Sequence, residues 1–261
     1  MRDLLRYRDL VSTLVMRDLK VRYRRSTIGF VWTMLQPLLM MAVFHVVFST
    51  IFTTKLPGGQ EGFPNYPLYA LCGILFWNFF SQSIVSSMNS LRLNAGLLQK
   101  LPVPKVVFPL ATVLSGVVNM LLALIPLFLL LLVTGSKFTP AMLFLPVAIL
   151  IAALFTLGAG LLLAPLAVFF SDVVELIGVL LTLMMYLTPI FYPKEIVPEH
   201  MRWIVRFNPV RSILEVFRDP IYQGEIPPLS HLSVALTIAV VALILGVWCF
   251  RRSSDRIPFY V

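Results

Sequence analysis

Charged residues are scarce in this sequence. Of its 261 residues, 13% are Asp, Glu, Lys or Arg and 59% are hydrophobic, whereas about a quarter of the residues in a soluble domain are charged. Several apolar runs are also long enough to cross a bilayer, so an ordinary soluble protein is excluded. We predict an all-α polytopic membrane protein whose residues 1–261 form a single transmembrane domain.

Motifs for catalysis and metal binding are absent. The sequence has no Gly-x-x-x-x-Gly-Lys-Ser/Thr loop, no His-Glu-x-x-His, no Gly-x-Ser-x-Gly and no metal-ligand spacing. Its two cysteines, Cys72 and Cys249, are expected near opposite faces of the membrane, which is too far apart for a disulfide. We therefore predict no catalytic residue, no metal site and no cofactor in this chain.

Positive charge is concentrated at the N-terminus. Eight of the 21 Lys and Arg precede residue 26, and no residue from 26 to 54 is charged. Such a basic segment stays at the cytoplasmic headgroups while the apolar run after it crosses the bilayer. A net charge of +9 can indicate nucleic-acid binding, but these cations flank apolar spans, so we expect lipid contacts and no nucleic acid.

Six segments have, or nearly have, the ~20 apolar residues that a transmembrane helix needs. They lie near residues 28–53, 66–91, 106–134, 140–168, 174–191 and 231–250. With both termini cytoplasmic, the cytoplasmic side carries 14 Lys and Arg and the outer side carries 7. This bias favours a multi-pass protein of the cytoplasmic membrane with a cytoplasmic tail at 251–261. The outer loop 192–230 is the exception, because it carries five Lys and Arg on the side where few are expected.

Two cytoplasmic segments have the pattern of short amphipathic helices. Within residues 1–25, apolar side chains recur at helical spacing from position 3 to 22, which predicts either an interface helix that braces a partner or a simple topogenic anchor. The loop 92–105 combines three cations and two prolines with a cluster of Leu97, Leu98 and Leu101. This loop is either a docking surface or a plain connector.

The outer loop 192–230 contains two further amphipathic patterns. Asn208-Pro209 is an N-cap followed by a first-turn proline, and Arg211, Glu215 and Arg218 are spaced to pair on the helix that follows. We expect either a re-entrant helix pair between spans five and six or two helices that lie flat on the outer surface.

Three further patterns concern the spans. His45 lies deep in the first span and is either a packed histidine or part of a proton relay. Asp172 is expected to cap the fifth span. Small side chains recur every four positions in span four, from Ala148 to Ala164, and this spacing lets another helix approach closely, more often one from the same chain.

Four ordered stretches resemble one known family. They are Arg17-Asp-Leu-Lys-x-Arg-Tyr-Arg-x-Ser26-x-x-Gly29-x-x-Trp32 with Pro37; Gly73-Ile-Leu-x-Trp77-x-Phe-Phe80; Asn94-x-x-Leu97-Leu-x-Lys100 with Pro104 and Pro109; and Thr188-Pro-Ile-x-Tyr192 followed by Asn208-Pro209 and Arg218. Over nearly its whole length the chain resembles the permease subunit of ABC exporters for O-antigen, capsule and teichoic acid. One departure is Ser171 before Asp172, where these permeases often have arginine.

The resemblance implies a homodimer of six-span subunits that binds two copies of a separate ATP-binding subunit, where ATP and Mg are held, and that moves a lipid-linked glycan through the bacterial inner membrane. It implies that the following residues contact the ATP-binding subunit: Arg17, Arg22, Arg24, Arg92, Asn94, Leu97, Leu98 and Lys100. It implies that the following aromatic residues line the channel: Trp32, Phe44, Phe48, Trp77, Tyr186, Phe191 and Tyr192. It implies that the following residues belong to an outer gate: Asn208, Pro209, Arg211, Glu215 and Arg218.

Aromatic residues are plentiful, with 20 Phe, 8 Tyr and 4 Trp. Most are expected in the core or at the membrane interfaces, although aromatic faces also suit the apolar faces of sugar rings. Three other functions stay open from the sequence: an ABC exporter for a drug or lipid, a membrane enzyme that acts on polyprenyl-linked sugars, and a structural anchor. The enzyme would need clustered acids or histidines, for which only Asp172 and Glu175 offer anything similar.

Overall fold

The computed structural model describes residues 7–23, 31–52, 65–100, 103–133, 138–193 and 197–257. Every regular element within these residues is a helix, which confirms the all-α prediction. Four residues with predicted roles lie outside this description: Arg24 by position, and Arg22, Phe44 and Phe48 by side chain. The same holds for Leu101 and for the side chain of His45.

The long helices are α3 (Val31–Phe52), α4 (Tyr66–Leu93), α6 (Val107–Val133), α7 (Leu145–Phe169), α8 (Val173–Leu187) and α11 (Leu229–Ser254). The shorter elements are α2 (Arg8–Tyr23), α5 (Ala95–Lys100), α9 (Arg202–Arg206), α10 (Pro209–Tyr222) and the 3-10 turns η1 (Pro140–Phe144) and η3 (Glu199–Met201). The six long helices coincide with the six predicted spans.

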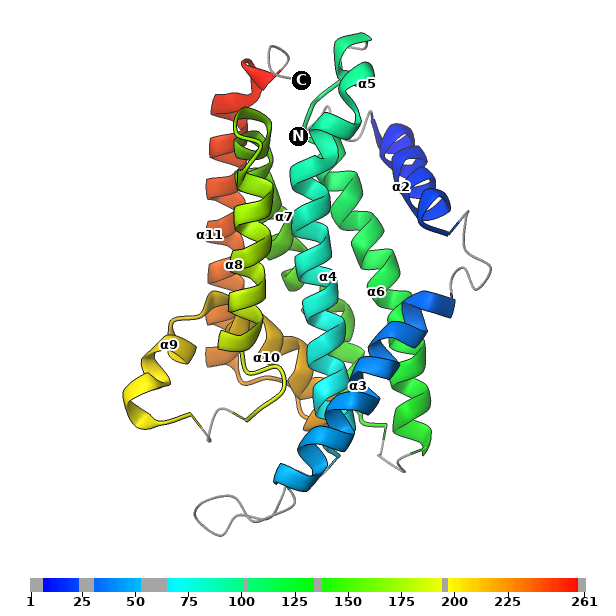
Figure 1. Cartoon of the computed structure of the whole chain (residues 1–261), viewed down its shortest axis with the longest axis vertical. Coiled ribbons are helices and arrows are strands. Elements are labelled where there is room, and N and C mark those ends of the chain that lie inside the picture. The colour runs from blue at the N-terminus through cyan, green and yellow to red at the C-terminus, as the bar shows by residue number, and fades with distance from the viewer. Residues whose placement is uncertain are drawn as a thin grey trace.

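The helices form an elongated bundle around α4, which packs against α3, α6, α7, α8 and α10 (Figure 1). α7 packs along α11 on the far side of the bundle. α5 and the C-terminal end of α11 lie at one end, which we call the inner end, and α9 and α10 lie at the other, the outer end (Figure 1). These names follow the orientation predicted from the charges.

Four helical segments are long and apolar enough to cross a membrane: α4, α6, the continuous η1–α7 and α11. α8 has 15 residues, which is about 22 Å at 1.5 Å per residue, against about 30 Å of hydrocarbon. α3 contributes a shorter apolar stretch, Met34–Val43. Each of the six predicted spans therefore contains a long helix among the described residues, and six complete crossings remain a prediction.

Small side chains set the closest helix contacts. A Cβ added at Gly160 would lie 2.9 Å from the Ser87 side chain of α4, so part of the small-residue stripe of α7 faces a helix of the same chain, as predicted. On another side of α7, a Cβ at Gly246 of α11 would lie 2.1 Å from the Gly158 carbonyl oxygen. These glycines let the backbones of α7 and α11 meet directly.

Two local predictions need correction. Asp172 precedes α8 but its side chain makes no capping hydrogen bond, because its backbone is already helical, whereas a capping residue is normally extended. Ser171 Oγ donates to Asp172 Oδ1 at 3.2 Å instead. The first outer helix is also shorter than predicted, since Pro198 is followed by the single turn η3 and then by five-residue α9.

Candidate functional site

At the inner end, the side chain of Asn94 joins α2 to α4. Asn94 Nδ2 donates to the Ser90 carbonyl oxygen at 2.7 Å, and Asn94 Oδ1 accepts from Arg17 Nη1 of α2 at 2.7 Å. Arg17 also donates through Nε and Nη2 to Asp18 Oδ1, at 3.1 and 2.8 Å. The fold thus brings together Arg17 and Asn94, two of the residues predicted to meet a partner subunit.

The apolar side of α5 faces the bundle. Leu98 is buried among side chains of α2, α6, α7 and α11, and Leu97 packs at the edge of this cluster. Arg92 Nη2 donates to the Val168 carbonyl oxygen at 3.4 Å, which ties the end of α4 to the end of α7. Lys100 is exposed. Leu97 and Leu98 of the predicted leucine cluster therefore anchor α5 to the bundle, and α5 presents its polar side outward.

At the outer end, the predicted helix start is confirmed. Asn208 Oδ1 accepts a hydrogen bond from the Val210 main-chain nitrogen at 3.0 Å, the geometry of an N-cap. The Nδ2 of the same side chain donates to Thr188 Oγ1 at the end of α8, at 2.8 Å. The predicted i, i+4 ion pair is also present, with Arg211 Nε 2.8 Å from Glu215 Oε1. Asn208 therefore both starts α10 and ties it to α8.

Arg218 takes a different place from the one predicted. It was expected on the polar face of α10 beside Glu215, but its side chain is buried, with 4% exposed. Nη1 donates to the Pro189 carbonyl oxygen at 2.8 Å and Nη2 to the Ile190 carbonyl oxygen at 3.2 Å. The guanidinium carbon lies 3.8 Å from the centroid of the Tyr69 ring of α4, a cation–π contact.

The chain break after α8 explains why Arg218 turns inward. Proline cannot continue the helix, so the carbonyl groups of residues 189–192 lose their helical partners. The Tyr69 hydroxyl lies 3.1 Å from the Pro189 oxygen and 3.0 Å from the Tyr192 oxygen, and the Tyr66 hydroxyl donates to the Phe191 oxygen at 3.0 Å. With Arg218, side chains satisfy all four carbonyls. We call this set, Tyr66, Tyr69, Pro189–Tyr192 and Arg218, the arginine cluster.

Two further phenols are Tyr222, which borders the arginine cluster, and Tyr192, which belongs to it. The Tyr222 ring meets the Tyr69 ring edge-on, with centroids 5.2 Å apart. Burial raises the pKa of Tyr222 to about 12 and also raises the pKa of Tyr192, whose hydroxyl donates to the Tyr186 carbonyl oxygen at 2.8 Å. Both phenols therefore stay neutral at physiological pH.

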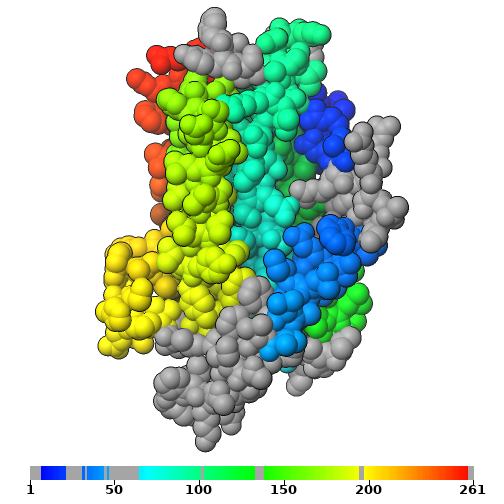
Figure 2. Space-filling view, viewed as in Figure 1, coloured from blue at the N-terminus to red at the C-terminus, as the bar shows by residue number. Residues whose placement is uncertain are grey.

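A groove of about 730 Å³ opens between α2, α3, α4 and α6 in the inner half of the bundle. This volume is in the range of small-molecule sites. Figure 2 shows the surface of α4 in cyan between yellow-green α8 and the blue helices α2 and α3. The groove runs from Arg17 and Asn94 at the inner end past Trp32 to Asn78 and Ala123. We call it the polar groove.

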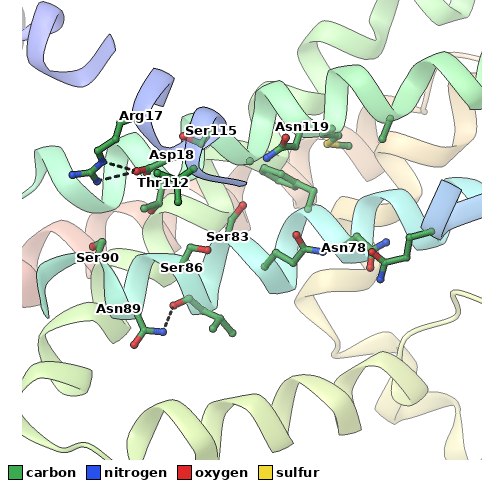
Figure 3. Close-up of a pocket in the computed structure, with 18 of the residues that line it drawn as sticks. Arg17, Asp18, Asn78, Ser83, Ser86, Asn89, Ser90, Thr112, Ser115 and Asn119 are labelled. Carbon is green, nitrogen blue, oxygen red and sulfur yellow. Dashed lines mark hydrogen bonds and ion pairs between the residues drawn. The ribbon is translucent and has the colours of Figure 1, made fainter. Parts of the chain in front are cut away.

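Uncharged polar side chains recur along two walls of the polar groove, among apolar ones (Figure 3). One face of α4 contributes Asn78, Gln82, Ser83, Ser86, Asn89 and Ser90. One face of α6 contributes Thr112, Ser115 and Asn119. From Asn78 to Ser90, α4 rises about 18 Å, more than half of the hydrocarbon thickness. A polar stripe of this length on a membrane helix is energetically unfavourable unless its groups have hydrogen-bond partners.

Ser83 is the most unusual member of the stripe. Its side chain is 2% exposed, and within the described part of the chain its Oγ has no hydrogen-bond partner. In Figure 3 the hydroxyl points from α4 toward the side of α6 that carries Ser115 and Asn119. Gly116 makes room for it, because a Cβ there would lie 2.2 Å from Ser83 Oγ. Buried hydroxyls normally have a partner, so this one marks a place for a ligand group or water.

The predicted channel aromatics separate into three environments. Trp32 is half-exposed and lines the polar groove. Trp77 and Phe191 are buried in the bundle core, where Trp77 packs against Phe80 with ring centroids 5.6 Å apart. Tyr186 is 63% exposed on α8. Of the predicted set whose side chains are described, the structure brings Trp32 alone into the polar groove.

The polar stripe was missed by sequence reasoning, which searched the spans for charged and aromatic side chains. The signal was present: amides and hydroxyls recur at i, i+4, i+8 and i+11 from Asn78 to Asn89 within an otherwise apolar span. No sequence pattern, however, places this stripe against Thr112, Ser115 and Asn119 of α6.

Comparison with known proteins gives a consistent result. The family model described as ABC-2 type transporter matches residues 9–222. The O-antigen export system permease protein RfbA of Myxococcus xanthus is 32% identical over 245 residues, which are 93% of this chain and 91% of that protein. The protein of the same name from Klebsiella pneumoniae is 27% identical over 95% of this chain and 93% of its own length. The polysialic acid transport protein KpsM of Escherichia coli is 21% identical, with 94% and 93% covered.

Proposed function

The chain belongs to the ABC-2 type transporter family, and from this premise we propose that it is the membrane-spanning permease of an ATP-driven exporter that moves a lipid-linked polysaccharide from the cytoplasm outward. The relatives named for O-antigen export and polysialic acid transport support this substrate class. Their similarity extends over nearly the whole chain, so it includes the helices that border the polar groove.

The single observation in the structure that carries the proposal is the polar groove. A sugar polymer presents hydroxyl groups to hydrogen-bonding partners and apolar C–H faces to aromatic rings. The groove offers amides and hydroxyls on α4 and α6, with Trp32 and Phe79 among the apolar lining residues.

The energy source is a separate ATP-binding subunit that docks at the inner end. The chain itself lacks a phosphate-binding loop. α2 and α5 are suited to transmit force because both are anchored in one apolar cluster with α6, α7 and α11, while Lys100 remains exposed for the partner. The cytoplasmic location of this end follows from the excess of cations on it.

A second copy of the chain completes the pathway. α8 is too short to match the hydrocarbon thickness, and the structure leaves one side of it exposed, with Leu176, Val179, Leu180, Leu183 and Tyr186. An interface between two copies would remove this mismatched helix from the lipid.

The proposed function is tested by deleting the gene and measuring surface polysaccharide. We expect surface glycan to be lost and lipid-linked glycan to accumulate in the cytoplasmic leaflet, with rescue by the wild-type gene. Unchanged surface glycan in the deletion strain would refute the proposal.

The docking role of α5 is tested by Lys100→Glu. We expect reduced export with ATP hydrolysis by the complex still measurable, because the reversed charge weakens the link between the subunits rather than either subunit. The matched control is Arg252→Glu, the same charge change at an exposed inner-end position of α11, which should export normally. Normal export by Lys100→Glu would remove α5 from the coupling path.

A further inference from the structure

We propose that the inner end of α11 is a binding site for an anionic phospholipid of the cytoplasmic leaflet, in which Arg251 and Arg252 hold the lipid phosphate and Trp248 packs against the lipid below it. The site lies on the surface of one protomer, outside the polar groove and the arginine cluster. It gives the chain a preference for phosphatidylglycerol over a zwitterionic lipid, whatever glycan the chain transports.

One side of α11 is exposed along most of its length. The helix forms an edge of the bundle (Figure 1), and its buried residues are Ala235, Ala239, Gly246 and Phe250. The exposed side carries large apolar side chains at helical spacing, which are Val234, Val240, Val241, Ile244, Leu245 and Trp248. Because α11 is long and apolar enough to cross a membrane, this side faces lipid.

The exposed apolar side of α11 continues into two cations. Arg251 and Arg252 follow Trp248 at i+3 and i+4, so they lie one turn further on the same side, and both are exposed. From His231 to Arg251 the helix rises about 30 Å at 1.5 Å per residue, which matches the hydrocarbon thickness. The two guanidinium groups therefore reach the inner headgroups, and Trp248 lies in the interfacial region where tryptophan is enriched.

The fold holds this end of α11 in place. Phe250 and Ile257, which precede and follow the two arginines, are buried in the apolar cluster that anchors α2 and α5. Lys105 Nζ donates to the Ser254 carbonyl oxygen in the last turn of α11. The backbone beneath both arginines is therefore fixed, and a lipid meets two cations whose positions are already set.

The charge of this end fits an anionic lipid. Residues 251–256 contain three arginines and one acid, Asp255, so their net charge is +2. In the orientation predicted from the charges, this end faces the cytoplasmic leaflet, whose anionic lipids attract nearby Lys and Arg. Guanidinium groups also suit phosphate oxygens, which they bind through parallel hydrogen bonds. A zwitterionic lipid has the same phosphate, but its own cation offsets the charge.

The test is native mass spectrometry of the purified full chain in detergent, with phosphatidylglycerol and phosphatidylcholine as the two probes. We expect the wild type to bind phosphatidylglycerol about tenfold more tightly, and Arg251→Gln/Arg252→Gln to lose most of that preference. Trp248→Leu keeps an apolar contact but removes the interfacial ring, so it should weaken binding of both lipids. Thermal unfolding without added lipid shows that each variant is folded.

The matched control is Arg202→Gln/Arg206→Gln in α9, which removes two exposed arginines beside the exposed Trp203 at the outer end. Arg202 Nη1 already donates to Glu199 Oε1 at 3.3 Å, so one of these two cations is compensated within the chain. The control variant should keep the wild-type preference for phosphatidylglycerol.

Three results would overturn the inference: no preference for phosphatidylglycerol in the wild type, equal losses in the two double variants, or displacement of the bound lipid by excess inorganic phosphate, which would assign the site to a free anion. The same spectra report the oligomeric state. Fewer dimers in Arg251→Gln/Arg252→Gln with unchanged lipid binding would assign this face to a second copy instead. None of these results bears on glycan export, which the deletion strain tests separately.

Discussion

α4 carries two polar regions that differ in where their hydrogen bonds go. Near the outer end, Tyr66 and Tyr69 bind main-chain carbonyls of the segment after α8, beside Arg218. In the inner half, the stripe from Asn78 to Ser90 faces the polar groove, and Ser83 Oγ has no partner among the described residues. One helix thus uses polar side chains both to hold the fold and to line an open site.

The difference shows how polar groups in a membrane helix can be classified. Where buried donors meet main-chain acceptors of the same chain, the group compensates for an irregular backbone, as Nη1 and Nη2 of Arg218 do for residues 189 and 190, while Arg218 Nε has no hydrogen-bond partner among the described residues. Where a buried hydroxyl without a partner also lines a groove, as Ser83 does within the described residues, its hydrogen bond is available to a ligand or to water. Mutations in the arginine cluster should therefore mainly lower stability, whereas mutations in the stripe from Asn78 to Ser90 should mainly lower transport.

The largest stability effect is expected for Arg218→Met. The change leaves two buried carbonyl oxygens without donors and removes the cation–π contact with Tyr69, so we expect a loss of about 3 to 5 kcal/mol. Its control is Arg211→Met on the same helix, which removes a partly exposed ion pair with Glu215 and should lose about 1 kcal/mol or less. Thermal unfolding in detergent measures both, and equal losses would show that the arginine cluster has no special role.

A smaller effect is expected for Gly73→Ala. The added Cβ would lie 2.5 Å from Arg218 Nη2 and 2.9 Å from the Ile190 side chain, so the guanidinium has to move away from its carbonyl partners. We expect a loss of about 2 kcal/mol. Gly96→Ala in α5 is the matched control, because nothing lies within 4 Å of its new Cβ. A stable Gly73→Ala would mean that Arg218 can move without loss.

A still smaller effect is expected for Asn208→Ala. It removes the N-cap of α10 and the hydrogen bond to Thr188, with an expected loss of about 1 to 2 kcal/mol. Asn208→Asp keeps the capping acceptor but not the Nδ2 donor, and should recover about half of that loss. If Asn208→Asp is as unstable as Asn208→Ala, the hydrogen bond to Thr188 provides the stabilisation and the N-cap contributes little.

Local sequence signals predicted the outer end only in part. The Asn208-Pro209 start and the Arg211–Glu215 pair depend on residues within one turn, and both are confirmed. The inward turn of Arg218 depends on carbonyls freed by the chain break at Pro189, 29 residues earlier in the chain. Helical periodicity assigns Arg218 to a polar face but does not reveal which backbone groups lie against that face.

The same limit applies to the inner end and the groove. The Leu97–Leu98 pattern predicted an apolar side of α5 but not that this side faces the bundle. The stripe on α4 could have been read from the sequence as a polar face of a span, but its opposition to Asn119 of α6 required the packing of two helices. The sequence patterns predicted the helices, but the neighbours that each helix face contacts depend on tertiary packing.

The smallest stability effect, and the sharpest contrast with the arginine cluster, is expected for Ser83→Ala. Because Ser83 Oγ has no partner among the described residues, its removal should change the free energy of unfolding by less than about 0.5 kcal/mol, or even stabilise the protein. Transport should nevertheless fall, since one donor and acceptor for the glycan is lost. Thermal unfolding and surface glycan, measured on the same variant, test the two halves of this expectation. A stability loss of more than about 1 kcal/mol would assign the hydroxyl to the fold, and the stripe on α4 would then resemble the arginine cluster instead of differing from it.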